Sequence, residues 1–348
     1  MANLRQWRQW IPGLALAAAI SVAALGLAQG AGLVRYGASS LTLAILIGAV
    51  LGNGWPALAQ GARRAGLGLA QRNLLRAGVA LYGFNLSWQQ IVAVGSAGLL
   101  ADVLLVASTL ALGCFIGIRL LGLDRETALL TAAGSAICGA AAVVATVPVL
   151  RLDEARTAEK TAVAVGTVVL FGTLAMGLYP LLYAWIGPQH LDFGRYVGST
   201  VHEVAQVVAI GDALGPEVAR GAVVVKMIRV LLLVPFLLLL GAFLARRGGA
   251  EAEAEAEGAS RRSPVAVPWF AVAFILLAGV NSLQLLPEGA VAALRQCGMV
   301  LLTAAMAALG LETTLARMGR AGLRPLLLGA ALFVHLVLGG GLLNWLLG

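Results

Sequence analysis

GSTVHEVAQVVAIGDALGPEVARGAVVVKMIRV, residues 198–230, is the stretch that decides how this chain folds. The rest of the chain is nearly all apolar, whereas this stretch carries His202, Glu203, Gln206, Lys226 and Arg229. An Arg, Lys or Asp side chain at the centre of a membrane helix costs roughly +2.5 to +3.5 kcal/mol on insertion scales. Because four ionisable groups stay close together in apolar surroundings, we expect them to line a polar site inside a membrane transport protein.

Composition supports a polytopic membrane protein. The chain has 348 residues, of which 60% are hydrophobic and 11% charged, whereas soluble domains have roughly 25% charged residues. Several apolar runs reach about 18 residues, which is enough to cross a bilayer as helices. The net charge of +8 fits basic cytoplasmic loops better than a nucleic-acid partner.

No enzyme signature is present. The chain has no GxGxxG, Walker or HExxH sequence, so nothing indicates a nucleotide-driven pump, a membrane protease or a cofactor. The three cysteines form no CxxC pair, and one His beside one Glu gives too few ligands for a metal. We therefore expect a protein without enzymatic activity.

Hydropathy predicts an all-α protein of about eleven transmembrane helices in one membrane domain. The predicted spans lie at about 11–28, 38–52, 74–95, 97–118, 126–150, 160–186, 193–213, 217–245, 265–286, 290–312 and 323–347. The charged, low-complexity segment 246–264 is typical of a disordered cytoplasmic loop. Residues 1–30 would form an extra N-terminal span ahead of two units of five, 38–186 and 193–347.

Two of the predicted spans look discontinuous. Gly134, Ser135 and Gly139 crowd the middle of 126–150, and Gly310 lies near the end of 290–312. Each is the fourth helix of its unit, as in an inverted repeat, and paired broken helices indicate a transporter's binding site. A separate local echo, GSAICGAAAVVA (134–145) against GSTVHEVAQVVA (198–209), is identical at six of twelve positions. It links spans that are not inversion partners, and chance can also produce it in a chain so rich in alanine and valine.

The basic residues predict the orientation. With a cytoplasmic N-terminus, sixteen Lys and Arg residues fall on the cytoplasmic side and six outside. Since cytoplasmic loops carry the excess of basic residues, the count favours a multi-pass protein of a bacterial inner membrane with its N-terminus inside. The segment from Arg151 to Lys160 falls outside against this rule, and one missed re-entrant segment would shift the parity.

Lys226 and Arg229 form the candidate anion site. They are three residues apart and share a helical face about ten residues inside a span. Arg offers a fork of donors to an oxyanion. A structural ion pair with Glu203 or Asp212 is the alternative.

The preceding span carries the candidate coupling groups. Ser199, His202 and Gln206 follow i, i+3, i+7 and would share one face, with Glu203 pointing about 100° away. His202 and Glu203 are placed to bind and release a coupling proton. A packing network between helices is the alternative.

Three further places are candidates. At the predicted break, Gly134, Ser135, Cys138 and Gly139 could offer backbone NH groups and a hydroxyl to an anion, or could serve close helix packing. Glu312 could coordinate a cation or lie at the water interface. Asp102 stands alone in its span as a further coupling candidate.

Five segments resemble the YeiH-type family of bacterial inner-membrane proteins, also called UPF0324. They are LLRAGVALYG (74–83), GSAICGAAAV (134–143), GSTVHEVAQVVAIG (198–211), VVVKMIRVLLLVP (223–235) and AMAALGLET (305–313). The family is similar to inverted-repeat transporters such as bile-acid sodium symporters and cation/proton antiporters. The resemblance implies a five-plus-five core with crossed broken helices, and the family's label implies export of sulfate or a related oxyanion such as sulfite.

The sequence thus predicts a secondary transporter that exports a small anion with a proton or sodium as coupling ion. Its other partners would be the lipid bilayer and, as a candidate, a second copy of the chain in a homodimer. Two alternatives stay open: a cation/proton exchanger that uses Glu203, Asp102 or Glu312, and a non-transporting membrane scaffold or sensor.

Overall fold

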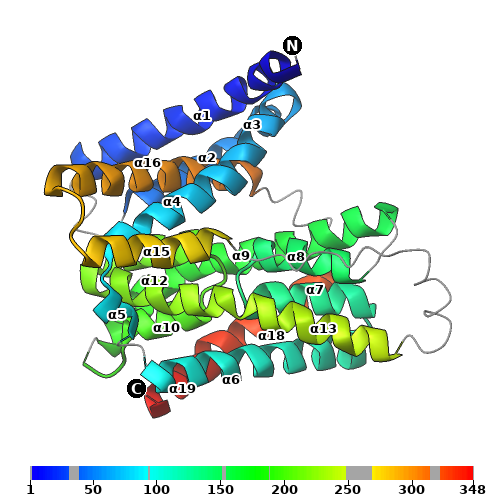
Figure 1. The fold of residues 1–348 in the computed structure, drawn as a ribbon. Helices are drawn as coiled ribbons and strands as arrows, with labels where there is room; N and C mark the ends of the chain where they lie inside the picture. The colour runs from blue at the N-terminus through cyan, green and yellow to red at the C-terminus, as the bar shows by residue number, and fades with distance from the viewer. Residues whose placement is uncertain are drawn as a thin grey trace.

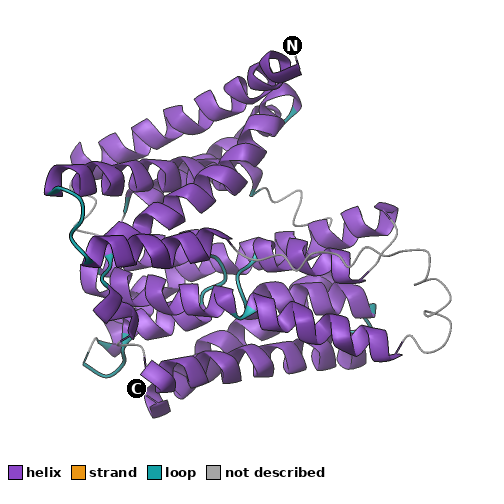
Figure 2. Cartoon of the chain, in the orientation of Figure 1, coloured by secondary structure: helices purple, strands orange, loops and turns teal. Residues whose placement is uncertain are grey.

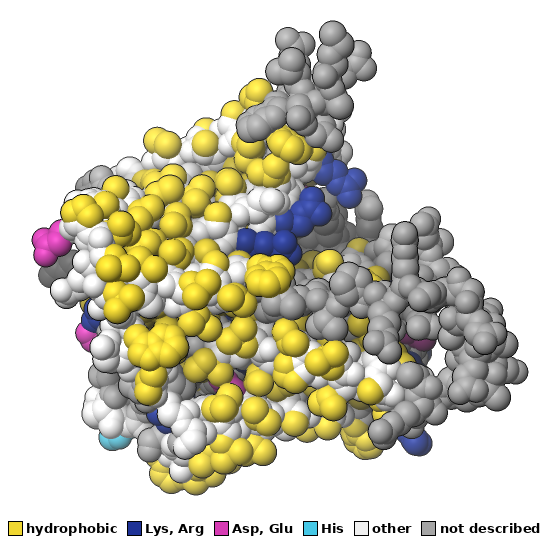
Figure 3. All heavy atoms as spheres, in the orientation of Figure 1, with side chains coloured by type: hydrophobic (Ala, Val, Ile, Leu, Met, Phe, Trp, Pro, Cys, Tyr) yellow, Lys and Arg dark blue, Asp and Glu magenta, His cyan; other side chains and the backbone are white. Residues whose placement is uncertain are grey.

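The computed structural model describes residues 2–30, 39–92, 95–150, 154–187, 189–247, 269–313 and 322–347. Over these residues the chain is helical, with short loops and turns between the helices (Figure 2). Six helices are long and apolar enough to cross a membrane: Gln9–Ala28, Gly98–Leu120, Glu159–Ile186, Pro216–Leu244, Glu288–Glu312 and Leu323–Leu347. Apolar side chains cover much of the visible surface (Figure 3), as contact with lipid requires. The expected all-α multi-pass membrane protein is confirmed at this level.

The helices have the following bounds. They are α1 (Ala2–Gly30), α2 (Ser40–Gly54), α3 (Arg64–Leu69), α4 (Leu75–Tyr82), α5 (Trp88–Val92), α6 (Gly95–Cys114), α7 (Arg125–Ala136), α8 (Ala140–Leu150), α9 (Glu154–Ile186), α10 (Phe193–Thr200), α11 (Val204–Leu214), α12 (Pro216–Leu231), α13 (Leu233–Arg247), α15 (Trp269–Ser282), α16 (Glu288–Glu312), α18 (Leu323–Val334) and α19 (Gly340–Leu347). Three π-helical segments join or extend them: η4 (Ala70–Leu74) between α3 and α4, η6 (Phe115–Leu120) after α6, and η7 (His335–Gly339) between α18 and α19.

The helices form two layers (Figure 1). The outer layer consists of α1, α2, α3–α4, α15 and α16, which pack on one another. The hairpin layer consists of α6, α7–α8, α9, α10–α11, α12–α13 and α18–α19. The layers meet where α11 contacts α2 and α4 and where α12 contacts α15.

The predicted span 126–150 is broken as expected, but it does not run straight through. The helix stops at Ala136, and α8 starts at Ala140 after Gly139, whose φ is +71°. The two arms then lie side by side, because Leu130 of α7 packs with Val143 of α8. A Cβ on Gly134 would lie 2.7 Å from Val143 Cγ2, so the glycine permits this close return. We call α7–α8 hairpin 1.

The predicted span 193–213 also folds back on itself. Its helix breaks at Val201–Glu203, and both arms, α10 and α11, pack on α12. Gly194 of α10 lies against Gly221, and Gly211 of α11 lies against Ala219, so the outer ends of both arms reach the same part of α12. We call α10–α11 hairpin 2. The i, i+3, i+7 face expected for Ser199, His202 and Gln206 is therefore wrong, because the helix is interrupted between them.

The two hairpins enter the hairpin layer from opposite ends. Lys160, near the start of α9, hydrogen-bonds Asp124 and Glu126 at the base of hairpin 1. At 33 residues, α9 extends about 50 Å at 1.5 Å per residue, and hairpin 2 starts shortly after its far end. The expected straight layout therefore put Lys160 at the wrong end of the membrane domain. Lys160 shares an end with Asp124, and Arg195 lies at the other end, beside Leu347.

The predicted break near Gly310 is wrong, because α16 continues to Glu312. Gly310 instead lets α16 cross α2 closely: a Cβ there would lie 2.2 Å from the Ile45 carbonyl oxygen and 3.0 Å from Gly48 Cα. Small residues at such crossings permit close backbone approach. Of the loop predicted at 246–264, the first two residues end α13, and the others lie outside the described residues.

Gly310→Ala should lower the thermal denaturation temperature in detergent. The added methyl group meets rigid backbone, and overpacking of this kind costs about 1–3 kcal/mol. The matched control is Gly279→Ala in α15, where a Cβ meets nothing within 4 Å. Since Ala favours helix over Gly by about 1 kcal/mol, the control should be neutral or stabilising. Equal melting temperatures for the two variants would contradict the crossing described here.

The base of hairpin 1 should depend on pH through Asp124. Partial burial acts to raise the pKa of this carboxyl group, but hydrogen bonds from Lys160 and the Thr127 amide outweigh it and hold the pKa well below its usual range. A lowered carboxyl pKa contributes stability above the unfolded value of about 3.9, and this contribution is lost as pH falls through the folded value. Asp124→Asn should thus melt earlier than wild type at neutral pH, with a gap that closes under acid. A gap independent of pH would contradict this role.

Candidate functional site

The tips of the two hairpins meet in the middle of the hairpin layer. Tip 1 is residues 137–139, between α7 and α8, and tip 2 is residues 201–203, between α10 and α11. These are the two halves of the sequence echo, aligned so that Ile137 matches Val201 and Gly139 matches Glu203. Each tip leaves carbonyl groups at the end of one helix and NH groups at the start of the next without helical partners.

Lys226 of α12 joins the two tips. Its side chain is fully buried. The Nζ atom donates to the carbonyl oxygen of Ile137 in tip 1 at 2.6 Å and to that of Val201 in tip 2 at 2.7 Å. Both carbonyls lie at C-terminal helix ends, where the partial charge is negative and a cation is stabilising.

Arg229 caps the end of α7. Its Nε atom donates to the Ala136 carbonyl at 2.5 Å, and its Nη2 atom donates to the Ser135 carbonyl at 3.2 Å. The residue is fully buried, and its Nη1 atom has no hydrogen-bond partner. The described residues contain no ion pair within 4.0 Å that involves Lys226 or Arg229. The expected alternative of a direct pair with Glu203 or Asp212 is therefore not what holds these cations.

Glu203 serves the opposite kind of helix end. Its Oε1 atom accepts a hydrogen bond from the Ala140 amide, the first residue of α8, at 3.2 Å. Its own amide donates to Gln206 Oε1 at 3.1 Å, so it also caps α11. Gly139 makes room for this contact, since a Cβ there would lie 2.3 Å from Glu203 Cγ. The carboxylate thus sits at a positive helix N-terminus.

A cavity of about 160 Å³ opens between the layers and reaches the two tips. Its lining brings together polar side chains and the first residues of α8 and α11: Gln71, Arg72, Arg76, Cys138, Ala140, Ala141, Glu203, Val204 and Ala205. Figure 3 shows dark-blue basic side chains in a row over the α3–α4 region, beside the junction of the layers. Two helix N-termini and two arginines thus bring positive charge to this cavity, beside the single carboxylate of Glu203.

Several buried polar groups in this region have no hydrogen-bond partner among the residues that the structure describes. They are both ring nitrogens of His202, both carboxyl oxygens of Asp102, the hydroxyls of Thr131 and Ser135, and Gln206 Nε2. Buried polar groups are almost always paired, so this concentration of unpaired groups sets the region apart from an ordinary apolar core. Asp102 of α6 is fully buried and interacts electrostatically with Arg229 and Lys226.

The structure brings most of the predicted site residues together. Gly134, Ser135, Cys138, Gly139, His202, Glu203, Gln206, Lys226 and Arg229 lie at or beside the tips, with Asp102 close by. Ser199 faces elsewhere, since its hydroxyl accepts from Asn344 of α19 at 2.9 Å. Glu312 lies apart at the end of α16, beside Thr313, whose carbonyl binds Asn53 of α2.

Sequence reasoning missed Gln71, Arg72 and Arg76. They line the cavity from the outer layer, in a region where hydropathy alone predicts no special role. The spacing of Arg72 and Arg76 was a usable signal, because residues four apart lie on one helical face.

Fold and site together define an all-helical, multi-pass membrane protein with a buried charged centre. The family described as "Conserved hypothetical protein 698" matches residues 12–329. The chain is 49% identical to "UPF0324 membrane protein PA5383" of Pseudomonas aeruginosa, over 98% of this chain and 95% of that protein. It is 46% identical to "UPF0324 inner membrane protein YeiH" of Escherichia coli K12, over 97% of this chain and 94% of that protein.

The chain belongs to the UPF0324 family, as the resemblance of its motifs indicates. The Escherichia coli relative is named an inner-membrane protein, which agrees with the six long apolar helices described above. No solved structure matches the chain.

Lys226→Met should loosen both tips. The variant leaves the Ile137 and Val201 carbonyls without their donor, and an unsatisfied buried group costs about 1–3 kcal/mol. Hydrogen–deuterium exchange should rise in the peptides that contain 134–140 and 199–204, and the melting temperature should fall. Met227→Leu, one residue along the same helix, is the control and should change neither. Unchanged exchange at both tips in Lys226→Met would show that the lysine does not join them.

Proposed function

We propose that the protein is a secondary transporter that moves a small anion together with a proton. The observation that carries this proposal is the 160 Å³ cavity, where the N-termini of α8 and α11 converge with Arg72, Arg76 and the carboxylate of Glu203. Helix N-termini at broken segments suit anionic groups. An ionisable carboxylate in the same lining supplies a group that can carry the coupling proton.

Glu203 and the anion would compete for one position. The carboxylate now accepts from the Ala140 amide. When Glu203 takes up a proton, its oxygen becomes a weaker acceptor and its negative charge is removed. An anion could then accept from the α8 amides, with Lys226 and Arg72 as nearby positive charges. Loss of the proton would restore the carboxylate and expel the anion, which gives coupling without any covalent step.

The substrate we favour is sulfate, sulfite or a related oxyanion, moved outward. Arg72 and Arg76 present forked guanidinium groups that match oxyanions. The outward direction rests on the family resemblance alone, and sodium stays an alternative coupling ion. The two arginines and two helix N-termini in the cavity lining favour the anion over the cation of a cation/proton exchanger.

For the topology we propose nine crossings and two re-entrant hairpins. The crossings are α1, α2, α3–α4, α6, α9, α12–α13, α15, α16 and α18–α19. Six described basic residues, Arg63, Arg64, Arg119, Arg125, Lys160 and Arg324, belong to the end at which hairpin 1 starts, and three, Arg195, Arg220 and Arg295, belong to the other end. The positive-inside rule then places the first end, with the N-terminus, in the cytoplasm.

The inverted repeat we infer pairs a hairpin and its following helix with a second such unit. One unit is α7–α8 with α9, and the other is α10–α11 with α12–α13. The two hairpins enter from opposite ends, and their tips carry the sequence echo. This pairing replaces the expected partnership of 126–150 with 290–312.

The test is flux in proteoliposomes with radiolabelled sulfate or sulfite. We expect uptake that a pH gradient drives, because protonation of Glu203 controls the site. Glu203→Gln mimics the protonated state and should abolish the response to the gradient, and Arg72→Gln with Arg76→Gln should reduce uptake severalfold. Arg119→Gln is the matched control, since Arg119 is an exposed arginine on η6, away from the cavity lining, and should transport normally.

Three results would each contradict the proposal. Absence of flux for every oxyanion rules out the anion class. Sodium-dependent activity that ignores anions identifies a cation exchanger. Intact physiological function after Lys226→Ala and Arg229→Ala together indicates a membrane scaffold or sensor.

A further inference from the structure

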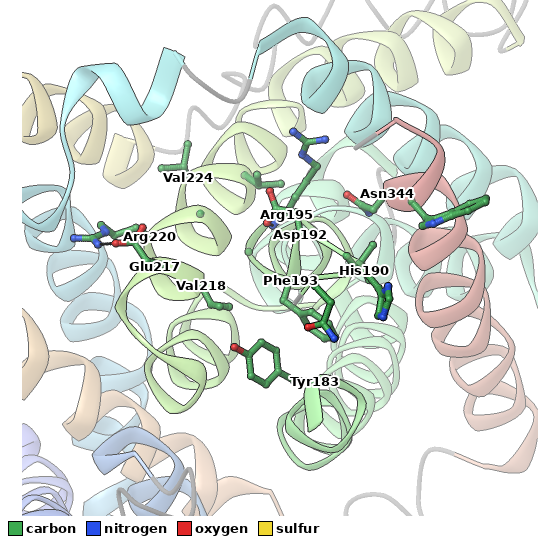
Figure 4. Close-up of a pocket in the computed structure, with 16 residues that line it drawn as sticks. Tyr183, His190, Asp192, Phe193, Arg195, Glu217, Val218, Arg220, Val224 and Asn344 are labelled. Atoms are coloured by element: carbon green, nitrogen blue, oxygen red, sulfur yellow. Dashed lines mark hydrogen bonds and ion pairs between the residues drawn. The ribbon is translucent and has the colours of Figure 1, made fainter. Parts of the chain in front are cut away.

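A second and larger cavity lies at the base of hairpin 2. It has a volume of about 750 Å³ and opens at the end of the hairpin layer opposite the base of hairpin 1. Figure 4 shows its lining, with His190, Asp192 and Arg195 before and within α10, Glu217 and Arg220 at the start of α12, and Asn344 on α19. Charged side chains of both signs, Asp192 and Glu217 with Arg195 and Arg220, line the walls, which suits protons and water better than one class of ion.

The inner end of this cavity approaches Lys226 and Arg229, the two buried cations that bind the tips. Its lining includes Val224 and Val225, the two residues before Lys226. It also includes Asn344, which is 1% exposed and whose Oδ1 atom has no partner. Asn344 Nδ2 donates to the hydroxyl of Ser199, which lies in the last turn of α10, next to tip 2. Polar groups therefore lead inward from the cavity.

Asp102 is linked by charge both to the tips and to this cavity. It interacts electrostatically with Arg229 and Lys226, which hold the tips, and with Arg195, which lines the cavity. Among the described residues, neither carboxyl oxygen has a hydrogen-bond partner, although Asp102 is fully buried. The helix α7, which packs on α6, carries the unpaired hydroxyls of Thr131 and Ser135. On its own helix, Ser108 bonds His335 at 3.0 Å.

We propose that the 750 Å³ cavity is the route by which protons reach Asp102, past Arg195. Uptake of one proton converts the carboxylate to a neutral carboxyl group and removes its attraction for Arg229. Arg229 then stays on the Ser135 and Ala136 carbonyls, whereas the charged form draws it toward α6. The cavity thus controls the capping of tip 1 from the base of hairpin 2. This inference rests on the proposed function, because it supplies the second access that a transporter requires.

Infrared spectroscopy tests the inference without any transport measurement. The protonated carboxyl of Asp102 should give a carbonyl stretching band that shifts down on transfer to D₂O, and Asp102→Asn should remove this band. The rate of the D₂O shift reports how fast protons reach the site. A spectrum of Asp102→Asn identical to that of the wild type throughout the accessible pH range would overturn the proposal.

Two variants, each with one of the cavities blocked by a bulky label, identify the route. In a background with Cys114, Cys138 and Cys297 changed to Ala, Val218→Cys places a bulky maleimide in the 750 Å³ cavity, and Leu75→Cys places the same label in the 160 Å³ cavity. The Val218 label should slow the Asp102 shift severalfold, and the Leu75 label should leave it unchanged. The reverse order, or equal rates for both, would refute the route. Because the readout is a proton at Asp102, failure of oxyanion flux does not affect this outcome.

Discussion

The pairing of two buried cations with helix-end carbonyls is the interaction on which the rest of the hairpin layer depends. Apolar surroundings offer backbone groups no water, so every interrupted helix needs partners inside the protein. Hairpins 1 and 2 each interrupt a helix, and Lys226 and Arg229 satisfy four of the carbonyls that are left, from Ser135, Ala136, Ile137 and Val201. Glu203 satisfies the Ala140 amide. The buried charges stabilise the helix breaks, and the unpaired backbone groups at the breaks in turn stabilise the buried charges.

Helix packing is tight in the outer layer and more open at the junction of the two layers. In the outer layer, α2 and α16 cross with Gly48 against Gly310, which leaves no room for side chains or for sliding of one helix on the other. At the junction of the layers, by contrast, the cavity separates α4 and α16 from the tips. A rigid framework beside a looser charged centre is the arrangement that a moving part requires, since packed cores do not deform gradually.

The sequence predicted the composition of the centre far better than its geometry. Costly charges in an apolar setting identify residues such as Lys226 and Glu203 directly, because no other placement explains them. Hydropathy, however, measures only how apolar a segment is, and a hairpin of two short helices has the same composition as one crossing helix. The prediction that 126–150 and 193–213 each cross as one straight span was therefore wrong. The echo between residues 134–145 and 198–209, by contrast, links the two segments whose tips meet. Gly310 shows the reverse difficulty, since a glycine that serves a helix crossing and one that serves a break look alike in sequence.

The 160 Å³ cavity reaches both tips, and the lining of the 750 Å³ cavity includes the two residues that precede Lys226. A voltage across a bilayer falls mainly over those parts of a membrane protein that water does not enter. Moving one elementary charge through that field is worth about 2.3 kcal/mol per 100 mV. Under the proposed function, a guanidinium or a proton that moves between the tips and α6 would move within this field, so transport would depend on voltage as well as on chemistry.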